Sequence, residues 1–344
     1  MSTELGIDRL TAAMTQAVAE SVGALGISSP NPPVGAIILD AAGGVVGIGR
    51  TARAGGPHAE VMALRAAGER AQGGTAVVTL EPCNHTGRTG PCSQALLDAG
   101  VSAVYYGVAD PNPTAAGGAT TLAAAGVRVL GGADLDPELV ELVRTGPLRA
   151  WLHRQRTGLP LVTAKIAATV DGRIAAPDGT SQWITGEQAR AFAHERRGQI
   201  DAIVVGTGTV RIDNPSLTAR YPDGVLREHQ PTRIVLGSSE IAAGSRILDE
   251  SAPTRRLRTH NPLDVLAAVP DALWVLVEGG PQVIGAFLAA DVVDEIDLYL
   301  APAILGAGRS AVEIGSATTI SDLRRFTFGE QRMLGDDLLI TLRR

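Results

Sequence analysis

The sequence predicts two α/β domains that follow one another along the chain. Short apolar runs of strand length alternate with helical patterns, which is typical of sheets covered by helices. The length of 344 residues exceeds what one hydrophobic core ordinarily supports. Breaks that contain glycine and proline, at residues 146–147 and 158–160, interrupt the pattern near its middle. We therefore predict domains at residues 1–156 and 157–344.

The composition indicates a well-packed globular protein, with 45% hydrophobic and 19% charged residues. The net charge of −6 argues against nucleic-acid binding, which usually goes with a basic excess. The chain shows no cationic segment followed by an apolar run at its start, and no apolar stretch of the ~18 residues that a membrane span needs. We expect a cytoplasmic protein with neither a membrane nor a nucleic acid as partner.

The elements of the first domain follow from local patterns. Apolar positions in residues 7–25 recur at helical spacing, and the runs at 34–40 and 45–49, separated by Ala-Ala-Gly-Gly, predict a β-hairpin. Beyond the hairpin we expect helices at 58–71, 91–100 and 120–126, and strands at 75–81, 101–110 and 127–130.

The second domain repeats the alternation without repeating the sequence. We expect strands at residues 161–169, 202–206, 232–237, 273–280, 295–305 and 337–343, and helices at 186–198, 262–269 and 281–290. The segments 221–231 and 239–258 carry no clear pattern and receive no prediction.

Both cysteines of the chain, Cys83 and Cys92, stand within ten positions of one another. In a cytoplasmic protein such cysteines more often bind metal or do redox work than form a structural disulfide. With His58 they make three good zinc ligands, which leaves the fourth position open as in catalytic sites. Glu60, two residues after His58, is placed to carry a proton to and from water that zinc activates. The pattern H-x-E followed by P-C and a second cysteine is the zinc deaminase arrangement.

Other interpretations of this pattern remain open. A lone H-x-E is common, and two cysteines nine positions apart are compatible with ordinary buried thiols. The usual deaminase spacing is C-x-x-C, whereas eight residues separate Cys83 from Cys92 here.

Residues 30–36 (PNPPVGA), 57–64 (PHAEVMAL), 79–92 (TLEPCNHTGRTGPC) and 109–113 (ADPNP) resemble the deaminase half of the bifunctional riboflavin-biosynthesis enzymes. The resemblance implies a cytidine-deaminase-like α/β/α domain in which His58, Cys83 and Cys92 bind Zn²⁺ and Glu60 shuttles protons. It also implies that Asn31, His85 and Arg88 face a pyrimidine ribosyl phosphate, and the planar fork of arginine suits phosphate oxygens. Two departures are Gly90, where proline is usual, and AAGGAT at 115–120, which lacks an arginine.

The second domain carries two turns of the kind that bind phosphates. Residues 273–290 run from an apolar strand through two glycines into a helix, and a similar glycine turn follows the strand at 202–206. Backbone amides and the helix dipole can meet a phosphate in such a turn. Many α/β turns look alike, so an ordinary structural turn is about as plausible.

AKIAATVDGRIA, SQWITG, GTGTVRIDNPSLTAR and VEGGPQVIGAFL, scattered over residues 163–286, resemble the reductase half of the same enzymes. That half is similar to dihydrofolate reductase and uses NADPH. The resemblance implies cofactor contacts at Ala167, Trp183, Thr209, Asp213, Gly280, Pro281, Gln282, Val283, Ile284, Gly285 and Ala286. It implies substrate contacts at Ser181, Arg197, Leu217, Arg220 and Glu278.

Lys165 is the only lysine of the chain and lies in the first strand of this domain, from which we expect it to point toward the reacting sugar as a catalytic residue. The alternative is a surface lysine on an edge strand. For Trp183 the alternative is core packing, and Arg197 and Arg220 are otherwise solvated charges. His153, His194, His229 and His260 show no partner pattern.

The sequence thus predicts a bifunctional enzyme of riboflavin synthesis that combines a zinc-dependent hydrolytic deaminase with an NADPH-dependent reductase. Its expected substrate is a small pyrimidine ribosyl phosphate, and we expect a homo-oligomer, a dimer or a tetramer. One rival is a zinc nucleoside or tRNA deaminase whose second domain only binds a nucleotide. The other is a protein in which zinc has a structural role.

Overall fold

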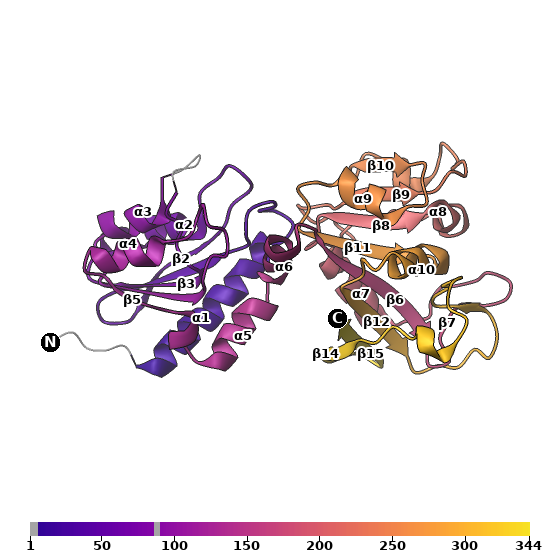
Figure 1. Ribbon diagram of the computed structural model, residues 1–344. Coiled ribbons are helices and arrows are strands. Elements are labelled where there is room, and N and C mark those ends of the chain that lie inside the picture. The colour runs from indigo at the N-terminus through magenta and orange to yellow at the C-terminus, as the bar shows by residue number, and fades with distance from the viewer. Residues whose placement is uncertain (1–5, 86–89) are drawn as a thin grey trace. The chain divides into compact units, whose positions relative to one another are not determined.

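The computed structural model describes residues 6–85 and 90–344, and the chain divides into two compact units, Met1–Gly158 and Leu159–Arg344. Each unit has its own β-sheet with helices packed against it (Figure 1). The predicted fold class, two successive α/β domains, is confirmed.

A five-stranded sheet forms the middle layer of the first unit (Figure 1). Its strands stand in the order β2-β1-β3-β4-β5, with β1 antiparallel to β2 and β3, and with β3, β4 and β5 parallel. The strands are β1 (Gly35–Leu39), β2 (Val45–Arg50), β3 (Thr75–Leu80), β4 (Ala103–Val108) and β5 (Arg128–Gly131).

Helices cover both faces of this sheet (Figure 1). On one face lie α1 (Ile7–Ser21) and α5 (Pro137–Thr145), and on the other α2 (Ala59–Ala67), α3 (Cys92–Asp98) and α4 (Gly118–Ala124). Helix α6 (Arg149–Thr157) ends the unit, and short 3-10 turns occupy Val22–Ala24, Gly68–Ala71 and Gly132–Asp134. Because helices lie on both sides, every residue of β1 and β3 is buried.

Two glycines of β2 determine where α2 begins. A side chain at Gly49 would come within 2.3 Å of the Ala59 carbonyl oxygen, and one at Gly47 within 2.1 Å of the Ala63 carbonyl oxygen. The absence of side chains therefore lets the helix backbone lie directly on the strand. This contact places the first turn of α2, with His58 just before it, against the sheet.

An eight-stranded sheet forms the second unit, in the order β10-β9-β8-β11-β6-β12-β15-β14. Neighbours from β10 to β12 are parallel, and β15 and β14 add antiparallel strands at one edge. The strands are β6 (Leu161–Thr169), β8 (Ala202–Gly206), β9 (Thr232–Leu236), β10 (Thr254–Leu257), β11 (Trp274–Gly279), β12 (Glu295–Ala301), β14 (Thr327–Leu334) and β15 (Asp337–Arg343). A separate pair joins β7 (Arg173–Ala175) to β13 (Arg309–Ser310).

The two faces of this sheet differ in polarity. Side chains of α9 (Pro262–Ala268) and α10 (Pro281–Ala289) pack with Ala164, Ile166 and Val277 in a large apolar core. Helix α7 (Glu187–Arg197) covers the opposite face, where alternate residues of the same strands include Lys165 and Glu278. The remaining helices are α8 (Thr207–Asp213) and the 3-10 turns Arg246–Leu248 and Ile320–Asp322. The period of two along the strands thus separates an apolar layer from a charged one.

Several elements differ from the sequence-based expectations. Helices α5, α6 and α8 were not predicted; α5 and α6 are the last helices of the first unit, and α8 follows the glycine turn after β8. Strands β10 and β14 were not predicted, because both are edge strands in which polar and charged residues outnumber buried ones. The strand expected at 295–305 ends at Ala301, since Pro302 cannot donate to a ladder. In the described ranges no helix combines the length and the apolar character that a membrane crossing requires.

Replacing Gly49 by alanine should destabilise the first unit. The new methyl group would overlap backbone atoms of α2, which cannot move away as a flexible side chain can. We expect a loss of about 1–3 kcal/mol in the free energy of unfolding, the usual cost of overpacking. Calorimetry should show a lower transition temperature for this unit, and an unchanged transition would contradict the close contact of α2 with β2.

Candidate active sites

His58, Cys83 and Cys92 are brought together by the ends of three elements. His58 immediately precedes α2, Cys83 follows β3, and Cys92 is the first residue of α3. The amide of Ser93 donates to the carbonyl oxygen of Cys83 at 3.1 Å, which ties the loop after β3 to the beginning of α3. The fold thus gathers three side chains that span 34 positions of the sequence.

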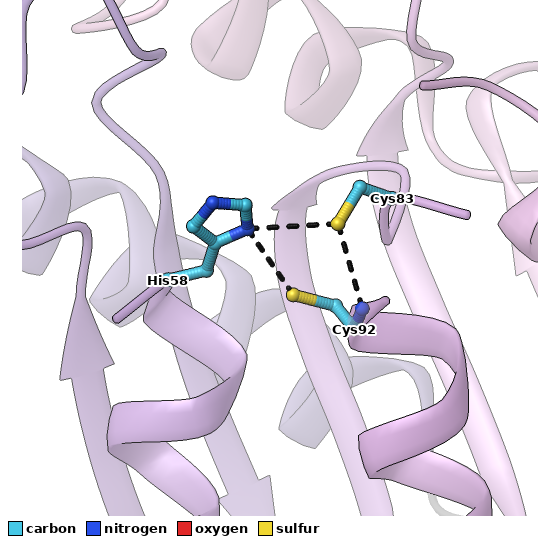
Figure 2. A group of neighbouring side chains, drawn as sticks. All are labelled: His58, Cys83 and Cys92. Atoms are coloured by element: carbon cyan, nitrogen blue, oxygen red, sulfur yellow. Dashed lines mark hydrogen bonds between the residues drawn. The ribbon is translucent and has the colours of Figure 1, made fainter. Parts of the chain in front are cut away.

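The donor atoms of these residues form a compact cluster. His58 Nδ1 lies 3.5 Å from Cys83 Sγ and 3.3 Å from Cys92 Sγ (Figure 2). All three atoms lie within 4.8 Å of one another, and neither cysteine is in a disulfide. One imidazole nitrogen and two sulfurs are a donor set that suits zinc and not the hard cations magnesium and calcium. The residues present therefore fit a zinc ion held by three protein groups.

The two thiols are electrostatically unequal. A hydrogen bond with Cys92, supported by His58 and by the Cys92 amide at 3.4 Å, lowers the pKa of Cys83. The same hydrogen bond and burial raise the pKa of Cys92. The hydrogen bond with Cys83 raises the pKa of His58. The imidazole and the two thiols therefore share protons through their hydrogen bonds. A divalent cation would displace these protons, because metal and proton compete for the same lone pairs.

Glu60 lies in the first turn of α2 beside this cluster, with 4% of its surface exposed. Burial, and after it the negative charge of Cys83, raise the pKa of Glu60 to about 7. Ordinary glutamates are ionised well below that value. A carboxyl group in this environment can take up and release a proton near neutral pH.

The other predicted residues of this site are less completely defined. Asn31 is half-buried in a turn, where the Ser28 hydroxyl donates to its carbonyl oxygen at 3.0 Å. His85 is exposed at the end of the described segment. The prediction for Arg88 falls outside the described residues.

Sequence reasoning missed Glu81, a buried carboxylate two residues before Cys83. Its oxygens accept from the amides of Asp110 at 3.2 Å and of Gly117 and Ala119 at 3.1 Å each. Glu81 thereby fixes the loop that leads into α4 beside the candidate metal ligands. In the same loop a side chain at Gly118 would come within 1.8 Å of the Pro82 carbonyl oxygen, which explains why a glycine stands at position 118. The signal in the sequence was an acidic residue between an apolar strand and Pro-Cys.

In the second unit the structure brings together three residues predicted separately. Arg197, at the end of α7, donates from Nε and from an Nη atom to the two carboxylate oxygens of Glu278 on β11, each at 2.7 Å. Lys165 lies close enough that its charge acts on Glu278. Its ammonium stands 5.6 Å from the ring centroid of Tyr299. Since β6 lies between β11 and β12, the interpretation of Lys165 as a lysine on an edge strand is wrong.

The charges of this cluster are mutually dependent. Burial alone would raise the pKa of Glu278, but Arg197 and Lys165 hold it at about 2. Burial lowers the pKa of Lys165, and Glu278 opposes that effect. The carboxylate thus stays ionised between two cations in a site that excludes much of the solvent.

The residues predicted at the cofactor lie partly together. A side chain at Gly280 would meet Thr209 Oγ1 at 3.6 Å, so the turn before α10 lies beside α8. The Ser181 hydroxyl donates to Asp213 at 3.3 Å, which joins a predicted substrate residue to a predicted cofactor residue. Trp183 is 69% exposed, so its interpretation as a core residue is wrong. The Arg190 guanidinium stacks 4.6 Å from its ring centroid.

The predicted substrate residues Leu217 and Arg220 lie in one segment after α8. Leu217 is buried, and Arg220 donates to the Thr218 hydroxyl at 3.0 Å and to the Gly224 carbonyl oxygen at 2.7 Å. Arg197 and Arg220 are therefore both partnered, and neither is a simple solvated charge. Sequence reasoning assigned no chemistry to His194, although it stands three positions before Arg197 on the same helix face.

Comparison with known proteins places both units in described families. Residues 8–108 match the family model of the cytidine and deoxycytidylate deaminase zinc-binding region, and residues 160–340 match that of the RibD C-terminal domain. The riboflavin biosynthesis protein RibD of Mycobacterium tuberculosis (strain H37Rv) is 50% identical over 330 residues, 96% of each chain. RibD of Escherichia coli K12 is 38% identical and covers 91% of this chain and 93% of its own.

Solved structures give the same result. The Thermotoga maritima diaminohydroxyphosphoribosylaminopyrimidine deaminase/5-amino-6-(5-phosphoribosylamino)uracil reductase superposes with a TM-score of 0.86 at 31% identity, covering 98% of this chain and 99% of its own. Acinetobacter baumannii RibD, in its form 1, has a TM-score of 0.84 at 33% identity with the same coverage.

Replacing Cys83 by serine should remove the metal. A neutral hydroxyl is a poor substitute for a thiolate, and two remaining donors hold zinc weakly. We expect one zinc per chain in the purified wild-type protein and almost none in Cys83→Ser, measured by elemental analysis of protein purified without added metal. Full zinc occupancy in the variant, or none in the wild type, would contradict the site.

Proposed function

Because the chain belongs to the RibD family of bifunctional deaminases and reductases, we propose that its deaminase site lies in Met1–Gly158 and its reductase site in Leu159–Arg344. The protein is an enzyme of riboflavin biosynthesis with Zn²⁺ and NADPH as cofactors. The observation that carries the proposed deaminase site is the cluster of His58, Cys83 and Cys92 beside the buried Glu60.

The two reactions act on one substrate in turn. The deaminase hydrolyses the exocyclic 2-amino group of 2,5-diamino-6-ribosylamino-4(3H)-pyrimidinone 5′-phosphate, so that water replaces the amine and ammonia leaves. The reductase then converts the ribosyl group to ribityl. The match of residues 160–340 to the RibD C-terminal domain sets aside the rival with a non-catalytic second domain.

We propose that Glu60 moves the protons of the deamination. A zinc ion held by His58, Cys83 and Cys92 supplies Lewis acidity, which makes water nucleophilic near neutral pH. Glu60 accepts a proton from that water and delivers it to the departing amine, two transfers that a carboxyl group with a raised pKa can make in turn. In this proposal Asn31, His85 and Arg88 contact the pyrimidine ribosyl phosphate, which orients its amino-bearing carbon.

For the reductase we propose that Lys165 acts on the opening ribose. NADPH supplies the hydride that reduces C1′ of the sugar. In the part of the chain that the structure describes, the Lys165 ammonium makes no hydrogen bond, so its donors are available to the sugar oxygens. Arg197 and Glu278 hold each other in a fixed geometry beside it, and this ion pair keeps the site ordered before the substrate arrives.

We propose the remaining contacts of the reductase site on the same basis, the resemblance of its motifs to the reductase half of the family. Ser181, Leu217 and Arg220 would contact the substrate together with Arg197 and Glu278. The cofactor would lie against Ala167, Trp183, Thr209, Asp213, Gly280, Pro281, Gln282, Val283, Ile284, Gly285 and Ala286. The neighbourhood of Thr209 and Gly280 and the exposure of Trp183 support this placement.

A homo-oligomer and a cytoplasmic location stay predictions. The edge strand β14 supports the first, because Phe328 is 72% and Met333 61% exposed on it. Light scattering of the purified protein, and fractionation of the cells that make it, test the two predictions.

Replacing Glu60 by glutamine should separate the two activities. The amide keeps the size of the side chain but cannot carry the proton, so deamination should fall by ~10²–10⁴-fold, the usual worth of a positioned acid and base. Zinc content and the reduction of separately supplied deaminated substrate should be unchanged. Both rates can be followed in the ultraviolet, the second through NADPH consumption. Loss of reduction as well would contradict two independent sites.

Replacing Lys165 by methionine keeps most of the apolar stem and removes the ammonium. We expect a large fall in the kcat of the reductase with near-normal NADPH affinity, measured by cofactor fluorescence, and intact deamination. Glu278 should tolerate the change because Arg197 still neutralises it. Wild-type reduction by this variant would show that the ammonium takes no part in the reaction.

A further inference from the structure

The segment Ser216–Arg220, which carries two predicted substrate contacts, has an unusual backbone. It belongs to none of the helices or ladder strands described above. Leu217 has a φ of +52°, and Asn214, just before the segment, has a φ of +40°. Such an angle is common for an asparagine at a helix end, but it is unfavourable for leucine and persists only where surrounding contacts impose it. The contacts that hold the backbone around Leu217 come from side chains.

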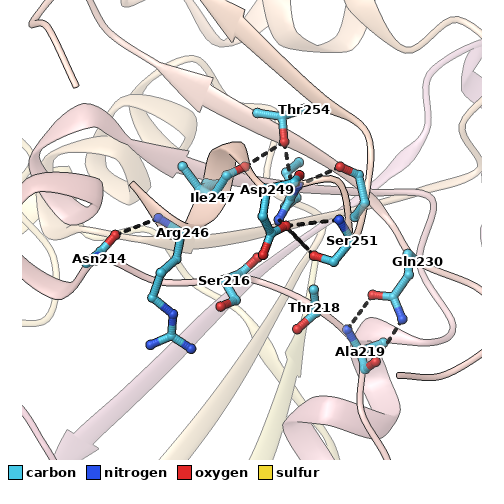
Figure 3. Close-up of polar contacts among 12 residues, drawn as sticks. Asn214, Ser216, Thr218, Ala219, Gln230, Arg246, Ile247, Asp249, Ser251 and Thr254 are labelled. Atoms are coloured by element: carbon cyan, nitrogen blue, oxygen red, sulfur yellow. Dashed lines mark hydrogen bonds and ion pairs between the residues drawn. The ribbon is translucent and has the colours of Figure 1, made fainter. Parts of the chain in front are cut away.

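Two of these side chains lie on the strand β9 and on the loop before it. Arg233, which is fully buried, donates to the carbonyl oxygen of Ser216 at 3.0 Å. Gln230 accepts from the amide of Ala219 and donates to its carbonyl oxygen, each at 2.8 Å (Figure 3). The side-chain amide of Gln230 thus makes the two hydrogen bonds with Ala219 that the main chain of a neighbouring strand would otherwise make.

The third side chain is His194 of α7. Its Nδ1 lies 3.0 Å from the carbonyl oxygen of Thr218, which also receives Arg197 at 3.4 Å. Arg197 in turn holds Glu278. His194 therefore connects the segment to the helix turn that carries Arg197. Through this turn the predicted substrate residues of the segment, Leu217 and Arg220, are linked to the ion pair of Arg197 with Glu278.

The proton of His194 has a defined position. A carbonyl oxygen can only accept, so Nδ1 must carry the hydrogen of this bond. Burial, and next the charge of Arg197, lower the pKa of His194; the hydrogen bond to the Thr218 carbonyl and then Glu278 oppose this shift without reversing it, and Arg220 adds to it. The ring is therefore neutral near pH 7, and in a neutral ring with hydrogen on Nδ1 the atom Nε2 has a free lone pair.

The clamped segment leaves donors available. Within the described ranges the amide of Leu217 has no hydrogen-bond partner, while the carbonyl oxygens of Ser216 and Thr218 on either side of it are held by Arg233 and His194. Arg220 is steered by the hydroxyl of Thr218, the residue whose carbonyl His194 holds. An amide and a guanidinium that lie three positions apart in one segment, Leu217 and Arg220, are groups of the kind that bind an anionic ligand group such as a phosphate.

We propose that His194 is a positioning residue of the reductase: through its Nδ1–H it fixes the Thr218 carbonyl, so that the Leu217 amide and Arg220 meet the phosphorylated substrate in the correct geometry. The inference rests on the proposed reductase site. It assigns to His194 no contact with the reacting atoms. Its loss should therefore weaken substrate binding and leave the hydride step itself largely intact.

Two substitutions test the position of the donor. The side-chain N–H of asparagine takes the place of Nδ1, whereas that of glutamine takes the place of Nε2. We expect His194→Gln to raise the KM of the reductase for the deaminated substrate roughly 10-fold, the effect of about one ordinary hydrogen bond. His194→Asn should stay within roughly threefold of the wild type. Both should keep the wild-type kcat to within the same factor and the wild-type affinity for NADPH.

His229 provides a matched control, because its Nε2 also meets a main-chain carbonyl, that of Ile200, at 2.8 Å. His229→Ala should lower the transition temperature without raising KM. Equal KM values in the two His194 variants, or a rise in the His229 variant as large as in His194→Gln, would overturn the inference in favour of a general role in stability.

A second measurement reads the tautomer of His194 in the wild-type protein itself. Nitrogen NMR of the histidine rings, with the His194 signals assigned by their loss in His194→Asn, should show hydrogen on Nδ1 and an unprotonated Nε2 at pH 7.5. The opposite tautomer would overturn the inference. A wild-type protein that does not reduce the substrate at all would instead contradict the proposed function. In that case the NMR measurement would still show whether His194 Nδ1 donates to the Thr218 carbonyl oxygen.

Discussion

Ionisable side chains buried against a sheet need partners, and this requirement governs both units of the protein. A charge taken out of water is unstable unless an opposite charge, a hydrogen bond or a metal compensates it. In the first unit Glu60, Cys83 and Cys92 are buried within one cluster, which a divalent cation would complete. In the second unit the Glu278 carboxylate has little exposure to solvent, and it stays ionised because Arg197 donates two hydrogen bonds to it.

The scaffolds around these clusters are correspondingly rigid. Gly47 and Gly49 allow α2 to lie on β2, and Glu81 ties three amides of the neighbouring loop. Near the second cluster, the side chains of Arg233, Gln230 and His194 form hydrogen bonds with main-chain groups of residues 216–219. These bonds take the place of those that a neighbouring strand would make. In both places side-chain hydrogen bonds or close packing hold the backbone beside the candidate site, which is how a site keeps its geometry without a ligand.

Much of the protein follows from short-range patterns. Short continuous apolar runs were enough to predict β1, β3, β8 and β11, because strands buried on both faces are hydrophobic along their whole length. The motif around His58, Glu60 and Cys83 was enough to predict a zinc deaminase, since each residue type has a specific role in that chemistry. Strands β10 and β14 escaped prediction because their place at a sheet edge, and not their composition, makes them strands.

The sequence by itself thus determined the two α/β domains and the family to which the chain belongs, and it predicted the candidate zinc ligands, because these depend on residue type and spacing. Only the tertiary structure decided that Lys165 lies in an interior strand, that Arg197 is paired with Glu278, and that His194 holds the segment of Leu217. These facts depend on contacts between residues that are distant in the sequence, such as Lys165 with Asp297 of β12 and Arg197 with Glu278. Such contacts arise from strand order and helix placement, which no local pattern encodes.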